Sequence, residues 1–221
     1  MALPATHIRF AATIVDRLAV SDMAVYLSGT LYPDSRWVTG IDRRLTHDRS
    51  CLDPEFPSDD FTLGWHIHCA CDRIQATLYA GLLEGPSKMD PEAWWYRISA
   101  AKVVQDISDA RKMDIGDHIS KLTHSRTPNG ESGEAVAAYL AYVRDTYSRT
   151  IPPGWADYVR LWTHVGWDRR RIYRIERQVD QILMDKALVF SLYGIFDRMV
   201  NQWTDPSTEM GCLSGDIPSR G

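Results

Sequence analysis

The sequence lacks several features that would assign a class of protein at once. It has only four cysteines among 221 residues and no CxxC pair, which is too few for a disulfide scaffold and indicates a reducing compartment. Its first residues show neither the positive charge nor the apolar run of a signal peptide. No apolar stretch approaches the roughly 18 residues that cross a bilayer. We therefore expect a cytoplasmic protein without a transmembrane segment.

Strong positive charge and phosphate-binding loops are also missing. The net charge is −4, so no basic field favours a nucleic acid, and we expect no such partner. The chain has no glycine-rich phosphate loop, no GxSxG elbow and no dinucleotide fingerprint. With 44% hydrophobic and 24% charged residues, it has the composition of an ordinary globular protein. The oligomeric state is unknown from these patterns.

Apolar residues recur mainly at helical spacing, and no run of alternating strand residues is long enough to matter. The pattern predicts an all-α, single-domain, multi-helix bundle over residues 1–203, which also holds the metal-binding residues described below. A tail over residues 204–221, rich in Pro, Gly and Ser, is expected to be irregular. The expected helices run over about 8–18, 22–27, 60–83, 92–112, 117–123, 132–147, 155–164 and 168–203.

Residues 30–58 are punctuated by prolines and a glycine, which predicts a long ordered loop between the second and third helices. A loop of that length inside a compact domain is either functional or a sign of misassignment. We interpret it as functional because it carries Asp34 and His47.

The segment from Leu63 to Asp72, LGWHIHCACD, carries the clearest chemistry. On a helix, His68 and Asp72 lie one turn apart on one face, at the edge of an apolar stripe. His66 points about 200° away from His68, so His68 is the better candidate ligand. The same spacing occurs elsewhere in the chain, and by itself it fits a hydrogen-bonded core histidine better than a metal ligand.

Further histidine and aspartate residues strengthen the case for a metal. His7 begins the first helix, and Asp34 and His47 lie in the expected loop. Neutral imidazoles and carboxylates are the ligands expected for zinc, manganese or iron, and a catalytic site leaves a coordination position for water. The sequence therefore predicts a divalent metal cofactor, with zinc favoured.

Four short pieces of the chain together resemble the zinc-dependent phospholipase C-like family. They are Thr6-His7, the Gly-x-x-x-Pro-Asp run that ends at Asp34, Thr46-His47, and the Leu-Gly helix with His68 and Asp72. The match covers about the first third of the chain and implies a helical fold. Secreted members use a processed amino terminus as a ligand. Because this sequence shows no signal peptide to be removed, we expect it to resemble only the intracellular relatives. The resemblance implies metal ligands at His7, Asp34, His47, His68 and Asp72.

The later ligands of that family have no clear counterpart here. The candidates are Asp106, Asp109, His118, His164 and Glu176. Lys102 and Asp106 are also spaced as an ordinary surface ion pair. A second resemblance is to metal phosphohydrolases of the HD type, in which His47-Asp48 would be the adjacent His-Asp pair, completed by His7 and Asp72.

Both resemblances imply a metal-dependent hydrolase that uses metal-activated water to cleave a phosphodiester or phosphomonoester. The substrate would be a small-molecule or lipid phosphoester. Asp48 is the candidate base, and Arg36 or Arg43 would hold the phosphate, although plain solvated charge explains these arginines equally well. The alternatives are a non-catalytic helical metal-binding protein and a helical interaction module without metal.

Overall fold

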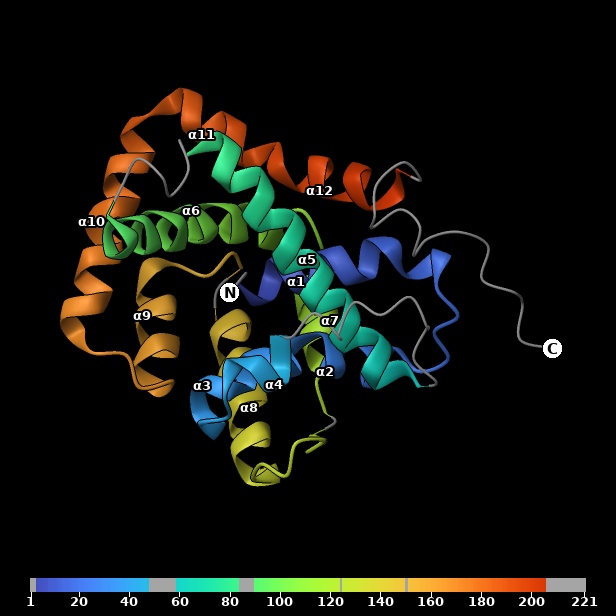
Figure 1. Cartoon of the computed structure of the whole chain (residues 1–221). Coiled ribbons are helices and arrows are strands. Elements are labelled where there is room, and N and C mark those ends of the chain that lie inside the picture. The colour runs from blue at the N-terminus through green and yellow to red at the C-terminus, as the bar shows by residue number, and fades with distance from the viewer. Residues whose placement is uncertain (1–2, 48–58, 84–89, 124, 150, 206–221) are drawn as a thin grey trace.

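The computed structural model describes residues 3–47, 59–83, 90–123, 125–149 and 151–205 (Figure 1). Helices are the only regular elements in these ranges, which confirms the expected all-α class. Among the described helices, none combines the length and apolar character that a membrane span requires.

Four helices surround the polar residues of interest, and their bounds are α1 (Pro4–Ile14), α2 (Met23–Leu31), α5 (Asp60–Leu82) and α6 (Pro91–Arg111). Short elements follow α2: the 3-10 turn η2 (Tyr32–Ser35), α3 (Arg36–Thr39) and α4 (Arg43–His47). The remaining elements are η1 (Val15–Arg17), α7 (Ile115–Ser120), α8 (Gly133–Arg149), α9 (Trp155–His164), α10 (Arg169–Met184), α11 (Lys186–Tyr193) and α12 (Ile195–Thr204). One cluster of buried apolar side chains extends from Leu3 to Trp203.

Helices α2 and α5 pack with their backbones unusually close together. A Cβ atom built on Gly64 of α5 would lie 2.0 Å from the carbonyl oxygen of Tyr26 in α2. Likewise, a Cβ atom on Gly29 would lie 2.0 Å from the carbonyl oxygen of Phe61. Only glycine permits such an approach, since it has no side chain to separate the two helices. This contact brings the second half of α2 beside the first turns of α5.

The start of α1 is held by carboxylates of α6. Asp106 accepts a hydrogen bond from the backbone N–H of Thr6, and Asp109 accepts one from the Thr6 hydroxyl. Arg9 donates to Asp109 as well. Asp106 is fully buried and Lys102 is 7% exposed, so the interpretation of Lys102 and Asp106 as a surface ion pair is wrong.

The expected long loop is largely helical up to His47. Pro33 lies in the first turn of η2, where its missing N–H leaves no hydrogen bond unmade. Gly40 ends α3 in the left-handed conformation with φ of 74°, which glycine adopts without strain. The punctuation therefore marks the ends of short helices. Residues 48–58 of the expected loop lie outside the described residues.

Other helix bounds also differ from the prediction, and α2 ends at Leu31 rather than near residue 27. The first helix begins at Pro4 rather than at residue 8, because proline suits the first helical turn. The single helix expected over residues 168–203 is three helices, α10, α11 and α12, with breaks at Asp185 and Gly194. The Asp185 side chain accepts a hydrogen bond from the backbone of Leu188 and so caps α11. Residues 206–221 of the expected tail lie outside the described residues.

Candidate metal site

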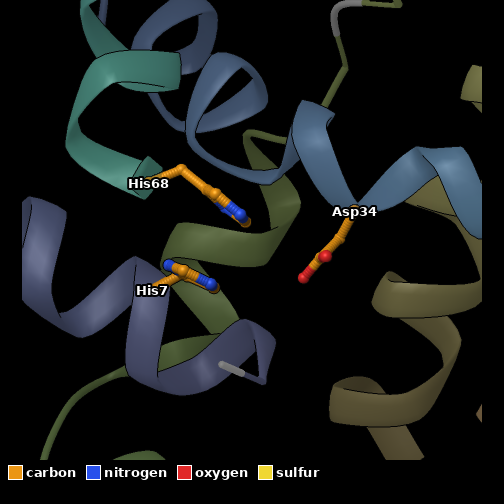
Figure 2. A group of neighbouring side chains, drawn as sticks. All are labelled: His7, Asp34 and His68. Atoms are coloured by element: carbon orange, nitrogen blue, oxygen red, sulfur yellow. The ribbon is translucent and has the colours of Figure 1, made fainter. Parts of the chain in front are cut away.

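The five predicted ligand residues lie together, although they come from four separate segments. His7 comes from α1, Asp34 from η2, His47 from the end of α4, and His68 and Asp72 from α5. Figure 2 shows the carboxylate of Asp34 directed toward the imidazoles of His7 and His68. Two groups of three have ligand atoms all within 4.8 Å of one another: His7, Asp34 and His68, and His47, His68 and Asp72.

The spacing of these atoms suits a bound cation. The Nε2 atoms of His47 and His68 are 3.2 Å apart, and Nε2 of His47 lies 3.7 Å from Oδ2 of Asp72. His68 Nε2 lies 4.0 Å from the same oxygen, as expected for residues one helical turn apart. Two ligand atoms at about 2.1 Å from one zinc ion and at a tetrahedral angle are roughly 3.4 Å apart. The observed separations lie around that value.

The ring orientation of His68 is fixed by the end of α2. Its Nδ1 lies 2.8 Å from the carbonyl oxygen of Thr30, which can only accept, so Nδ1 carries the proton. The lone pair of a neutral His68 is therefore on Nε2, facing His47 and Asp72. His47 Nδ1 also faces an oxygen, the Thr46 hydroxyl at 2.8 Å. Both imidazoles can thus present Nε2 to a shared cation.

His7 supplies the strongest sign that something else binds here. Its side chain is fully buried, and within the described part of the chain neither ring nitrogen has a hydrogen-bond partner. Its ring stacks on His68 with centroids 3.9 Å apart. Oδ1 of Asp34, which is 1% exposed, also lacks a hydrogen bond among the described residues. Buried polar atoms without partners are rare in native proteins, and a metal ion would satisfy both groups.

Burial sets the protonation of the imidazoles. It lowers the pKa of His7 and of His68, and it lowers the pKa of His47 to about 2. For His7 and His47, the nearby His68 acts in the same direction. All three rings are therefore neutral at physiological pH, which is the form that ligates metals.

The pKa values of the two carboxylates, Asp34 and Asp72, are shifted in opposite directions. Burial raises the pKa of Asp34. Burial alone would also raise the pKa of Asp72, but nearby cationic groups, Lys102 among them, hold it well below its usual range. Asp72 is thus an anion beside neutral imidazoles, with the Nζ atom of Lys102 3.8 Å from its Oδ1. A fixed negative charge among neutral ligands favours a divalent cation.

The candidate later ligands do not join this group. Asp106 and Asp109 bind the start of α1, and Asp106 also accepts hydrogen bonds from the buried hydroxyls of Tyr147 and Tyr158. His164 is exposed and stacks on Tyr142. The remaining two candidates, His118 and Glu176, belong to neither group of possible metal ligands among the described residues. His118 Nδ1 lies 2.7 Å from the carbonyl oxygen of Asp114 in its own helical turn.

Of the two candidate catalytic residues, only Arg36 is described. It opens α3, two residues after Asp34, and its guanidinium lies 4.0 Å from the ring centroid of Trp37. Asp48 lies outside the described residues. Lys102 was not among the predicted site residues. Polar residues recur at positions 102, 105, 106 and 109, on one side of α6, and this recurrence could have indicated a buried polar face.

These residues could hold one or two divalent cations through neutral imidazole nitrogens and carboxylate oxygens, with lysine and arginine at the edge. Comparison with known proteins found no matching family model, no matching curated protein and no matching solved structure.

Proposed function

We propose that this protein is a metal-dependent hydrolase of phosphoesters, with the metal held by His7, Asp34, His47, His68 and Asp72. The proposal rests chiefly on one observation: His7 and Asp34 are buried beside three other ligand-type residues, yet His7 and Oδ1 of Asp34 make no hydrogen bond in the described part of the chain. A divalent metal bound there, zinc by preference, would activate water and polarise a phosphoryl oxygen.

Cationic side chains beside the site favour an anionic substrate. Lys102 lies against Asp72, and it lines a cavity together with Arg36 and Arg43. Guanidinium groups bind phosphate oxygens in pairs, and a lysine adds a compact positive charge. In the proposed reaction, these three side chains bind and orient the phosphate. Asp72 would supply a carboxylate oxygen to the metal beside the imidazoles, whose rings are oriented by Thr30 and Thr46. The substrate would be a small-molecule or lipid phosphoester.

A second candidate function is a structural, non-catalytic metal site. The near-complete burial of His7, Asp34 and His68 favours it, because a site with four protein ligands and no open position is typical of structural zinc. The two functions differ in whether water and substrate reach the metal.

The first experiment combines elemental analysis with a phosphatase assay. The chain purified without chelators should contain zinc or manganese, and it should slowly hydrolyse p-nitrophenyl phosphate or its bis-ester. Asp72→Asn should abolish the activity while the far-ultraviolet dichroism stays helical. Bound metal without activity on any phosphoester would favour the structural site. Activity that survives both Asp72→Asn and exhaustive chelation would exclude the proposed mechanism.

Two adjacent arginines give a matched test of phosphate binding. Arg43 lines the cavity, whereas the Arg44 side chain is 86% exposed and pairs with Asp42. Arg43→Met should raise KM for phosphoesters about tenfold, since a charge-assisted contact contributes roughly 1.5–3 kcal/mol when desolvated and less at an exposed edge. Arg44→Met should leave KM within twofold. Equal effects of the two substitutions would exclude a specific role for Arg43.

A further inference from the structure

A cavity of about 420 Å³ adjoins the candidate metal site, and five of the eight tryptophans line it. They are Trp37, Trp94, Trp95, Trp162 and Trp167. Lys102, which contacts Asp72, and Arg36, which follows Asp34 by two residues, belong to the same wall. The cavity therefore has an aromatic part and a cationic part, and the cationic part is nearest to the site.

The indole rings surround Trp167. Trp162 stacks on it with centroids 5.1 Å apart and an interplanar angle of 18°, and Trp37 meets it edge-on at 5.5 Å. Trp95 lies 5.4 Å away at an inclined angle. Rings that already pack against one another make a rigid wall, and rigid aromatic walls bind planar groups at little entropic cost. Core packing alone explains the contacts between rings but not the hollow that they line.

We infer that this cavity binds the alcohol part of the phosphoester, and that this part is a planar ring system that packs against the indole rings. The phosphate then lies toward Lys102 and Arg36, beside the candidate metal site. The inference rests on the proposed function for the identity of the phosphate ester. It adds the substrate class, an aryl or heteroaryl phosphoester rather than an alkyl or acyl one.

The test compares two phosphate esters on the zinc-loaded chain. 4-Methylumbelliferyl phosphate carries a planar ring system, and butyl phosphate carries none. Affinity is read as Kd by calorimetry, or as KM where the ester is hydrolysed, and released methylumbelliferone is followed by fluorescence. We expect the aryl ester to bind at least about tenfold more tightly, since stacking adds to area burial.

Two partly buried tryptophans provide the matched variants. Trp94 lines the cavity, whereas Trp155 is not among the residues that line it. Trp94→Leu should reduce the preference for the aryl ester to within about threefold, and Trp155→Leu should keep it. Near-ultraviolet dichroism verifies that each variant is folded.

The outcomes separate the two proposals. Tight, tryptophan-dependent binding of the aryl ester without hydrolysis would support the cavity inference and count against the proposed function. Hydrolysis of both esters with equal KM would support the function and overturn the inference. Identical effects of Trp94→Leu and Trp155→Leu in folded protein would also overturn it.

Discussion

The glycine contact between α2 and α5 allows a sharp prediction about how the site is built. In Gly64→Ala, the new methyl carbon would start 2.0 Å from the Tyr26 carbonyl oxygen and 2.8 Å from the Thr30 backbone nitrogen. Real Cβ atoms essentially never approach other atoms within 3.0 Å, and neither neighbour is a flexible side-chain end. The two helices must therefore separate locally by at least about 1 Å.

Such overpacking costs about 1–3 kcal/mol of unfolding free energy. In a protein of this size the melting temperature should fall by roughly 2–12 °C. Because His68 follows Gly64 by one turn, its 2.8 Å contact with the Thr30 carbonyl should lengthen as well. The affinity for zinc should then fall about 10–100-fold, as it does when a partner that orients a ligating histidine is lost.

Gly81→Ala is the control within the same helix. A Cβ atom at Gly81 meets nothing within 4 Å, so the substitution should stabilise the protein by about 0.5–1 kcal/mol through helix propensity. Urea unfolding followed by dichroism, with zinc titration of each variant, gives both quantities. If the two substitutions change stability in the same direction, the close packing of α2 on α5 is not what positions His68.

Three further predictions address the site itself. His68→Ala should lose metal by elemental analysis, whereas His66→Ala should keep most of it, because His68 belongs to both groups of candidate ligands and His66 to neither; equal loss would contradict the helical placement. The three site imidazoles have lowered pKa values, so protons compete with metal only below the usual histidine range, and zinc should stay bound at pH 5.5; release with a midpoint near pH 6.5 would refute this. Tyr147→Phe removes a hydrogen bond to Asp106 and should cost about 1–3 kcal/mol in urea unfolding without changing zinc stoichiometry; altered stoichiometry would place Asp106 among the ligands.

Local signals predicted the helices whose ends carry their own caps. Asp59 and Asp90 accept hydrogen bonds from the first turns of α5 and α6, and both helices begin within one residue of the predicted start. The breaks at Asp185 and Gly194 were missed for a physical reason. Apolar residues continue at helical spacing across both positions, since α10, α11 and α12 all bury one face in the same core. Hydrophobic periodicity indicates which face of a helix is buried, but it does not indicate where one helix ends and the next begins with a different axis direction.

The site, too, was only partly predictable from local patterns. The spacing of His68 and Asp72 alone places them on one face of a helix, and His68 Nε2 lies 4.0 Å from Asp72 Oδ2. The positions of His7, Asp34 and His47 depended on a resemblance to known proteins, because no local rule links segments from different parts of the chain. Lys102 was missed since its partner, Asp72, lies on another helix. Helical spacing assigned Lys102 to Asp106 instead, although Asp106 binds the backbone of Thr6, 100 residues away.

The surroundings of His7 argue that the site is organised for a ligand rather than left over from packing. The residue before it, Thr6, is tied by its backbone to Asp106 and by its hydroxyl to Asp109, so the start of α1 is fixed by buried carboxylates. His7 itself has no hydrogen bond in the described part of the chain, although it lies between polar groups. An apolar residue would fill that volume without the cost of burying two polar nitrogens. The fold thus holds a neutral imidazole rigidly beside Asp34 and Asp72, and it is a bound cation that would make this arrangement favourable.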